Sequence, residues 1–237
     1  MYTAFEVVPA DLAAAVAAVR ALHLGGLSVT MPHKAAIVAE LDEVTDTARV
    51  LGAVNSVCLR GDTLVGDNTD GAGFVDGLRF SGCDLGDARV GVVGAGGAAR
   101  AIVAAVAGAG AAEVVVVNRD RGRAEVAAGL AGAVGRVGTG GDLAAVDVIV
   151  NATPVGMAGD PGLPLDVEVL SDSQTVVDAV YHPLRTPLLA AAEARGARTV
   201  DGLGMLVGQA AVSFTWWTGV EAPIAAMRAA ARGAVAP

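Results

Sequence analysis

The stretch VVGAGGAARA, residues 92–101, follows a β-branched apolar run and opens an alanine-rich helical pattern. A strand, a glycine turn and a helix in this order are typical of a dinucleotide-binding unit. Gly94 allows the tight turn, Gly96 lets the backbone approach a pyrophosphate, and the small Ala99 permits close packing of the helix on the strand. The N–H groups and dipole of the helix N-terminus favour the phosphates. A glycine-rich turn without a ligand is the alternative interpretation.

The same order of elements recurs along the chain. Four β-branched runs alternate with helical patterns, and these runs are RVGVVGA (89–95), EVVVVNR (113–119), VDVIVNATP (146–154) and TVVDAVY (175–181). Such alternation indicates a parallel sheet with helices on both faces. The sequence therefore predicts an α/β protein whose main domain, residues 85–202, is a Rossmann-type doubly wound parallel sheet.

The residues before this domain predict a second, smaller α/β domain over positions 1–80. Its predicted elements are strands at 2–7 and 25–31, helices at 9–22, 34–52 and 71–82, and a hairpin that turns at Gly61-Asp62. Thr45 and Asp46 mark a possible break in the helix at 34–52. Residues 203–237 predict two C-terminal helices separated near Gly219.

Composition excludes several classes of protein. The 237 residues carry a net charge of −9 with scattered Lys and Arg, so no nucleic-acid partner is expected. The apolar run at 101–112 is too short to span a bilayer, and no signal peptide is expected at the N-terminus. Cys58 and Cys83 make neither a disulfide framework nor a metal site. A cytoplasmic protein without a membrane span or metal is predicted.

The residues that follow the second β-branched run indicate which dinucleotide is bound. A site for NAD usually carries Asp or Glu there to hold the ribose 2′-hydroxyl, whereas arginine suits the 2′-phosphate of NADP. This chain has Arg119 at that place, with Arg121 and Arg123 close behind. Asp120 opposes the assignment slightly, and a solvated basic loop is the alternative. NADP is the predicted cofactor.

Seven stretches resemble the motifs of the shikimate dehydrogenases, in that family's order and almost from end to end. They are GLSVTMPHK (26–34), GAVNSV (52–57), GDNTDGAGF (66–74), GAGGAAR (94–100), NRDRGR (118–123), NATPVGM (151–157) and DGLGMLVGQA (201–210). The resemblance implies a substrate domain, a nucleotide domain and C-terminal helices that return to the first domain. It also implies NADP-dependent, reversible reduction of 3-dehydroshikimate to shikimate, in chorismate and aromatic amino-acid biosynthesis. A monomer or homodimer is expected.

The motif matches imply roles for individual residues. Lys34 and Asp70 resemble the family's catalytic pair. The residues that resemble substrate ligands are Thr30, Asn55, Tyr181 and Gln209. Those that resemble cofactor ligands are Gly94, Gly96, Gly97, Ala98, Asn118, Arg119, Arg123, Thr153, Gly202 and Met205, the last near the nicotinamide.

Ketone reduction explains why these residue types are needed. The nicotinamide supplies a hydride, and an ammonium at Lys34 can supply or relay a proton and stabilise a developing alkoxide. Neutral donors and acceptors such as Thr30 and Asn55 suit a polyol substrate. Without the resemblance, Lys34 would be interpreted as a surface lysine and His33 as a structural histidine.

One departure from the family pattern stands at the N-terminus. The family usually opens with a strand, a Ser-x-Ser pair and a helix before the part that resembles YTAFEV (2–7), and this chain does not show them. A shortened substrate domain is therefore expected. Two alternatives stay open: a relative that oxidises quinate or uses NAD, and a truncated chain that binds nucleotide without activity.

Overall fold

A computed structural model describes residues 2–235 and divides the chain into two compact units. The first unit comprises Met1–Thr69 and Ser213–Val220, and the second comprises Asp70–Val212 and Glu221–Pro237. The predicted ranges 1–80 and 203–237 include three positions, 1, 236 and 237, that lie outside the described residues.

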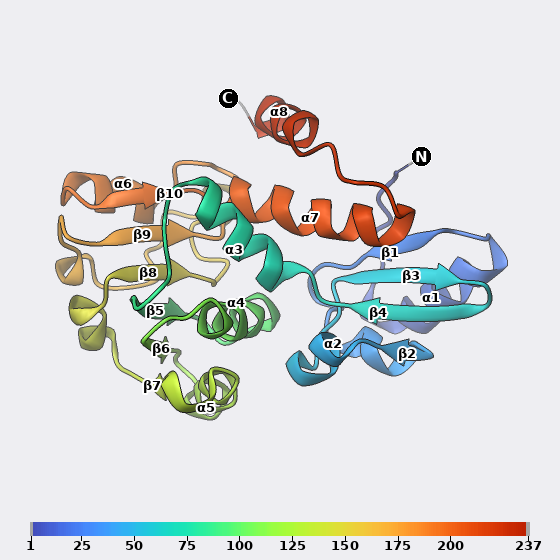
Figure 1. The fold of residues 1–237 in the computed structure, drawn as a ribbon, viewed down its shortest axis with the longest axis horizontal. Helices are drawn as coiled ribbons and strands as arrows, with labels where there is room; N and C mark the ends of the chain where they lie inside the picture. Colours follow the sequence, from blue (N-terminus) through green and yellow to red (C-terminus); the bar gives the residue numbers. More distant parts are fainter. Residues whose placement is uncertain (1, 236–237) are drawn as a thin grey trace. The chain divides into compact units, whose positions relative to one another are not determined.

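The second unit is built on a parallel six-stranded sheet with the strand order β10-β9-β8-β5-β6-β7 (Figure 1). The strands are β5 (Arg89–Val93), β6 (Glu113–Val117), β7 (Gly135–Val137), β8 (Val148–Asn151), β9 (Thr175–Asp178) and β10 (Arg198–Val200). The strand order reverses at β5, since β6 lies on one side of it and β8 on the other. The predicted Rossmann-type doubly wound sheet is confirmed.

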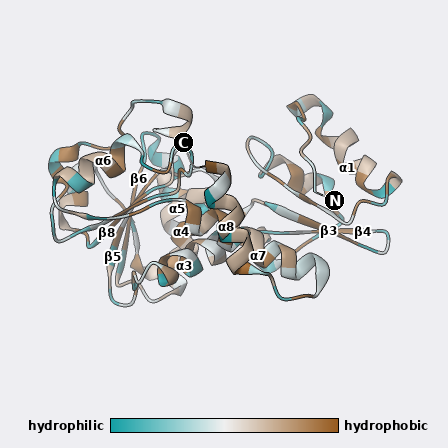
Figure 2. Ribbon diagram, turned by 90° about the horizontal axis from the view of Figure 1, so that it is seen from above, coloured by the Kyte–Doolittle hydropathy of each residue, from teal (hydrophilic) through white to brown (hydrophobic). Residues whose placement is uncertain are grey.

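Helices cover both faces of this sheet (Figure 2), because successive strand residues point to opposite sides. Val114 and Val116 pack toward α3, α4 and α5, while Val115 packs toward α6. The helices are α3 (Asp70–Phe80), α4 (Gly97–Gly108), α5 (Arg121–Gly129), α6 (Pro187–Ala194), α7 (Leu203–Thr218) and α8 (Ile224–Val235). Short 3-10 turns are η3 (Gly132–Val134), η4 (Gly140–Ala145), η5 (Met157–Gly159) and η6 (Val167–Val169).

The first unit contains a four-stranded mixed sheet with the order β1-β3-β4-β2. Its elements are α1 (Leu12–Ala21), α2 (Asp46–Leu51), β1 (Gly26–Ser28), β2 (Glu43–Val44), β3 (Ser56–Arg60) and β4 (Thr63–Asp67), with 3-10 turns η1 (Pro9–Asp11) and η2 (Ala36–Glu40). The predicted hairpin joins β3 and β4 through Gly61, whose φ of 60° favours glycine. The end of α7 packs on this sheet, where Trp217 lies against Gly26.

Two predicted elements of the first unit are wrong. Residues 2–7 form no strand, because they pair with no described strand, and the ring of His33 instead bonds the Val7 carbonyl at 2.7 Å. The predicted helix at 34–52 is divided into η2, β2 and α2. β2 forms because Glu43 and Val44 pair with β4, and the predicted break is real, since the Thr45 hydroxyl caps α2 by accepting from the Ala48 N–H.

Glycines on both partners bring α3 and the amino-terminal half of α7 into close contact. A Cβ added to Gly73 would lie 2.1 Å from the Gln209 nitrogen, and one added to Gly208 would lie 2.4 Å from the Gly73 oxygen. One turn away, a Cβ on Gly77 would lie 2.6 Å from the carbonyl carbon of Gly204. Only glycine fits at Gly73, Gly77 and Gly208, and a Cβ on Gly204 would lie 3.2 Å from the Gly77 Cα. The four-residue spacing of the glycines on one helix matches that on the other.

Gly73→Ala is expected to lower the free energy of unfolding by about 3 kcal/mol, because the added methyl group meets backbone rather than a flexible side chain. Gly108→Ala is the matched control, since an added Cβ there meets nothing within 4 Å and a helical alanine should change stability by less than about 1 kcal/mol. Urea unfolding of both variants measures the difference. Equal stability of the two variants would contradict the close contact of α3 and α7.

Candidate functional site

The glycine turn lies between the ends of β5 and α4. Gly94 has φ 119° and its N–H donates to the Val117 carbonyl at 2.9 Å. A Cβ on Gly94 would approach the Ala152 oxygen to 3.0 Å, so the turn has no room for a side chain there. Gly96 caps α4 without a side-chain hydrogen bond, and a Cβ on it would meet nothing within 4 Å. The first turn of α4, with Gly97 and Ala98, therefore has backbone N–H groups that no side chain of the N-cap accepts, and the space beside Gly96 is open.

The neighbouring strand ends bring the other predicted cofactor residues to the same edge. Asn118 and Arg119 follow β6, and Thr153 follows β8. The Thr153 methyl carbon would be 3.2 Å from a Cβ on Gly94. Because β5 lies between β6 and β8, these residues surround the glycine turn at the carboxyl edge of the sheet, where α/β folds bind ligands (Figure 1).

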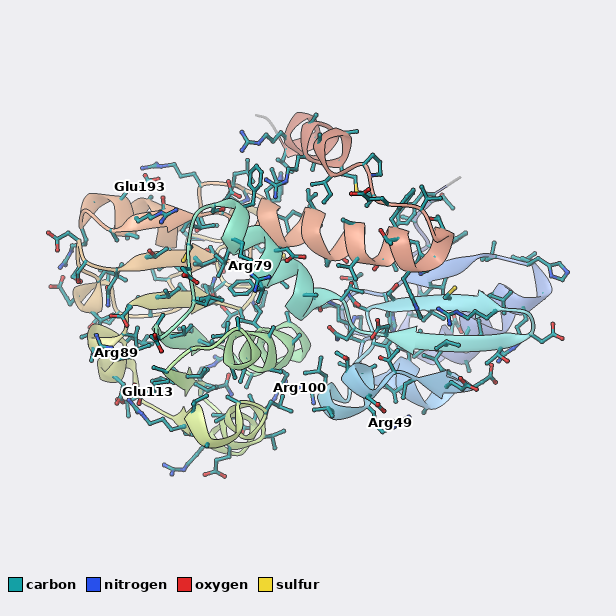
Figure 3. All side chains as sticks on the ribbon, in the orientation of Figure 1. Arg49, Arg79, Arg89, Arg100, Glu113 and Glu193 are labelled. Carbon is teal, nitrogen blue, oxygen red and sulfur yellow. The ribbon has the colours of Figure 1, made fainter. Side chains whose placement is uncertain are left out.

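The opposite edge of the sheet carries ion pairs instead. Figure 3 shows Arg89 and Glu113, the first residues of β5 and β6. Arg89 pairs with Asp147 at 2.8 Å, and Glu113 pairs with Arg136 at 2.6 Å. The Arg89 guanidinium holds the pKa of Asp147 below its ordinary value. These charges are half-exposed and far along the strands from the glycine turn.

The arginines after β6 differ in their partners. Arg121 pairs with Glu125 at 3.0 Å, whereas Arg119 and Arg123 form no ion pair within residues 2–235. The Asp120 carboxylate caps α5 by accepting from the Arg123 N–H at 3.0 Å. Asp120 is thus engaged at the helix end, and the Arg119 and Arg123 guanidiniums have no acidic partner among the described residues.

A buried polar network fixes the loop that carries Thr153. The Asn151 side-chain oxygen accepts from the Thr153 N–H at 3.0 Å and from its hydroxyl at 2.7 Å. The Asn151 amide donates to the Asp178 carboxylate at 2.9 Å. Asn151 and Asp178 end the neighbouring strands β8 and β9, and both are fully buried. The pair therefore ties the loop after β8 to the loop after β9.

Asp178 receives two further hydrogen bonds. The Thr186 hydroxyl donates at 2.7 Å and the Val180 N–H donates at 3.0 Å. Burial raises the pKa of Asp178, while these donors oppose the rise. Thr186 also caps α6 by accepting from the Leu189 N–H at 3.2 Å. One threonine thus holds both a buried carboxylate and a helix start.

The ends of β9 and β10 lie together. A Cβ on Gly202 would come within 2.5 Å of the Ala179 oxygen, which leaves no room for a side chain. Tyr181 follows β9 and is 42% exposed. Met205 is half-buried on α7 against the main core, and Gln209 lies one turn further along. The Gln209 side-chain amide donates to the Leu206 carbonyl at 2.9 Å.

In the first unit, backbone hydrogen bonds join the motifs that carry Thr30, Lys34 and Asn55. The Val29 N–H donates to the Asn55 carbonyl at 2.7 Å, and the Val54 N–H donates to the Lys34 carbonyl at 2.7 Å. Lys34 is half-buried in the turn that precedes η2, while Thr30 is exposed. The fold of this unit thus gathers three predicted site residues that lie up to 25 positions apart.

Asn55 is buried and organises the segment that leads to Asp70. Its side-chain oxygen accepts from the Thr69 N–H at 2.8 Å, and its amide donates to the Thr69 hydroxyl at 3.0 Å. The same hydroxyl lies 3.1 Å from that of Ser213. Asp70 comes directly after Thr69, begins α3 and is only 3% exposed. A carboxylate at a helix N-terminus is electrostatically favoured.

The sequence interpretation missed Thr69, Asn151, Asp178 and Thr186. A signal was present for two of them, because Asn151 and Asp178 are polar residues at the ends of buried, β-branched strands. Thr186 stands next to Pro187 at the start of α6, a pattern that indicates a helix cap. Their mutual contact could not be read from spacing, since Asn151 and Asp178 lie 27 positions apart.

Comparison with known proteins identifies the family. A relative from Moorella thermoacetica, described as shikimate dehydrogenase (NADP(+)), is 44% identical over 238 residues, which are 96% of this chain and 81% of that protein. The chain belongs to the shikimate dehydrogenase family. Family models match in three parts: the shikimate dehydrogenase substrate binding domain at residues 1–57, shikimate / quinate 5-dehydrogenase at 78–155, and the shikimate 5′-dehydrogenase C-terminal domain at 202–232.

Solved structures of the family share the fold. Shikimate 5-dehydrogenase from Thermus thermophilus, in complex with NADP(H) and shikimate, has a TM-score of 0.91 at 36% identity, covering 97% of this chain and 86% of that one. Quinate dehydrogenase from Corynebacterium glutamicum, in complex with NAD, has a TM-score of 0.85 at 36% identity, covering 92% and 81%. The family thus includes members solved with either dinucleotide.

No helix within residues 2–235 is both long and apolar enough to cross a membrane. No group of three or more His, Cys, Asp or Glu in this part of the chain could hold a metal ion.

Thr186→Ala is expected to lower the free energy of unfolding by about 3 kcal/mol at neutral pH, because it removes a helix cap and a donor to a buried carboxylate. Thr186→Ser keeps the hydroxyl and should cost less than about 1 kcal/mol. Urea unfolding across pH measures both variants.

The stability penalty of Thr186→Ala should change with pH in a defined direction. Because the folded pKa of Asp178 is raised above 3.8, ionisation of this group costs stability as pH rises from 3.8 through the folded value. Loss of a donor makes ionisation costlier, so the penalty of Thr186→Ala should grow over that window. A penalty independent of pH would show that the hydroxyl does not act through the carboxylate.

Proposed function

We propose that the chain catalyses the NADP-dependent, reversible reduction of 3-dehydroshikimate to shikimate, the oxidoreductase step that leads toward chorismate and the aromatic amino acids. The observation that carries the proposal is the 44% identity, over 96% of the chain, to a protein described as shikimate dehydrogenase (NADP(+)). The glycine turn and the polar site residues support it independently.

The domain roles form part of the proposal. Residues 1–80 hold the substrate, residues 85–202 hold NADP, and residues 203–237 return to the substrate domain. The gathering of Thr30, Lys34 and Asn55 by backbone hydrogen bonds supports the first role. The open N-terminus of α4 supports the second. The grouping of Ser213–Val220 with the first unit supports the third.

NADP fits the residues around the glycine turn. Gly94, Gly96, Gly97 and Ala98 would hold the pyrophosphate through the backbone N–H groups of α4. Asn118, Arg119 and Arg123 would hold the adenosine end, with the arginines on the 2′-phosphate. Thr153, Gly202 and Met205 would line the nicotinamide end. Bound NADPH supplies the hydride.

Lys34 would protonate the substrate oxygen as the ketone is reduced. It is the sole lysine of the chain, and the permanently charged cationic side chains are all arginines. An ammonium can give up a proton near neutral pH when its surroundings favour it, whereas a guanidinium cannot. Asp70 would be the carboxylate of the pair, and its burial at the start of α3 holds it in one place.

The remaining polar residues would orient the substrate. Thr30, Asn55 and Gln209 offer neutral donors and acceptors to hydroxyl groups, and the half-exposed Tyr181 adds a phenol. A site of this kind rejects analogues that lack a hydroxyl, because its own groups would be left without partners. The orientation of Asn55 by Thr69 supports a fixed geometry for its contacts.

Lys34→Ala is expected to lower kcat by about 10²–10⁴-fold, because the proton carrier is lost. The Kd for NADP should change less than about threefold, since the cofactor residues are untouched. Lys34→Arg is the informative control: it keeps the positive charge without a transferable proton, and its kcat should stay within about tenfold of the alanine variant. Steady-state assays of NADPH absorbance measure both. If the arginine variant were as active as the parent enzyme, Lys34 would contribute only its positive charge and would not donate the proton.

Arg119→Gln/Arg123→Gln should weaken NADP binding by about 10–100-fold, because charge-assisted hydrogen bonds to the 2′-phosphate are lost. NAD binding should change little. Arg121→Gln is the matched control, since Arg121 already pairs with Glu125. Calorimetric titration with both dinucleotides measures the effect. An equal loss for NAD and NADP would contradict a role at the 2′-phosphate.

Two alternatives give different results in the same assays. A quinate dehydrogenase that uses NAD would turn over quinate with NAD, as the name of the Corynebacterium glutamicum relative suggests for that protein. A chain that binds nucleotide without activity would show a thermal shift with NADP and none with shikimate. We favour NADP because Arg119, rather than Asp or Glu, lies in the loop after β6, and because the adjacent Asp120 is engaged at the start of α5. We favour shikimate because the relative with 44% identity is described as a shikimate dehydrogenase.

We further propose a cytoplasmic location and a monomer or homodimer. Cys58 and Cys83 are both buried as free thiols, and burial raises the pKa of Cys83. Such thiols suit a reducing compartment. Sedimentation velocity of the purified protein measures the oligomeric state.

A further inference from the structure

A cavity of about 280 Å³ lies in the second unit, outside the predicted cofactor and substrate residues. The end of α3, strand β10, the start of α7 and helix α8 surround it, and Figure 1 shows α8 beside α7. The lining residues that matter are Phe80, Arg198, Asp201, Leu203, Arg228 and Arg232. We call it the arginine pocket.

Three guanidiniums from two elements face this pocket. Arg198 is fixed at the start of β10 by bonds to the Ser81 carbonyl and, at 3.0 Å, the Gly82 carbonyl. Arg228 lies over the ring of Phe80 with its guanidinium carbon 3.1 Å from the ring centre. Arg232 follows one turn later on α8. The ring holds Arg228 in place by a cation–π contact.

The described residues leave most of the positive charge of the pocket without an acidic partner. Neither Arg228 nor Arg232 forms an ion pair with any residue in the described range 2–235, and the Nε of Arg228 is buried without a hydrogen-bond partner there. Burial lowers the pKa of Arg228, and the neighbouring charge of Arg232 lowers it further. Among the described residues that line the pocket, Asp201 alone is acidic, and it accepts a hydrogen bond from the Leu203 N–H at 3.0 Å. Clustered cations in a chain of net charge −9 indicate a place for an anion.

We propose that the arginine pocket binds a small organic oxyanion, with a carboxylate or phosphate group held by Arg198, Arg228 and Arg232. Planar guanidiniums bind both groups in a bidentate way. The apolar walls at Phe80 and Leu203 suit a carbon body, and Asp201 can accept a hydrogen bond from a hydroxyl of the ligand. Two lining residues, Asp201 and Leu203, flank Gly202 in the sequence, so an occupant of the pocket would contact the turn that precedes α7.

Thermal unfolding at low ionic strength tests the proposal with two probes, inorganic phosphate and citrate. At least one is expected to raise Tm saturably, by about 3 °C at tenfold its Kd. Sodium chloride of equal ionic strength should not reproduce the rise. The Arg228→Gln/Arg232→Gln variant should lose the rise, whereas Arg119→Gln/Arg123→Gln, with the same change of charge elsewhere, should keep it.

Arg232→Gln alone is the control for misfolding of α8 in the double variant, because it leaves the contact of Arg228 with Phe80 intact. It should weaken binding of the effective probe by about tenfold in calorimetry. No saturable rise with either probe would overturn the proposal. A rise that survives loss of Arg228 and Arg232, or that disappears with Arg119 and Arg123, would overturn it too and assign the anion to the dinucleotide site.

Discussion

The close contact of α3 with α7 is the constraint on which the second unit depends. Gly73 and Gly77 meet Gly208 and Gly204 backbone to backbone, and the distances leave no room for a methyl group on Gly73, Gly77 or Gly208. This contact fixes the two helices that carry three predicted site residues, since α3 begins with Asp70 and α7 bears Met205 and Gln209. A displacement of either helix would move these side chains. The glycines, which weaken isolated helices, therefore have a structural reason to be there.

The carboxyl edge of the parallel sheet is organised by a different kind of interaction. The glycine turn needs an empty cradle, and Gly94 and Gly96 provide it by having no side chains. Beside it, Asn151, Asp178 and Thr186 form a buried polar network in which the described hydrogen bonds lock two loops together. A carboxylate buried without such donors would be costly, so the network must be complete in order to be stable. Rigidity at this edge is what a hydride-transfer site requires, because reactive atoms must be held at short distance.

The chain uses arginine and lysine side chains at different kinds of position. Arginine serves wherever a fixed positive charge is needed, in ion pairs such as Arg89–Asp147 and in the loop of Arg119 and Arg123. Lysine occurs once, at Lys34. The two groups differ in chemistry, since a guanidinium keeps its proton in proteins, whereas a lysine ammonium can act as a proton donor where its surroundings favour it. The arginine pocket extends the same principle to a part of the second unit to which the dehydrogenase reaction assigns no role.

The sequence by itself determined the doubly wound sheet, the glycine turn, the hairpin at Gly61 and the two C-terminal helices, because each depends on local periodicity or on a residue with special backbone freedom. The family motifs also predicted a set of site residues, and the structure brings Thr30, Lys34 and Asn55 of that set together by backbone hydrogen bonds. The predicted strand at 2–7 and the predicted helix at 34–52 are wrong, because a strand depends on a partner distant in the sequence. Residues 2–7 have no described partner strand, and Glu43 and Val44 interrupt the predicted helix by pairing with β4. Only the tertiary structure decided that Asn151 meets Asp178, that Gly73 meets Gly208 and that three arginines face one cavity. These contacts join distant positions, and no local pattern specifies which buried donor will meet which acceptor.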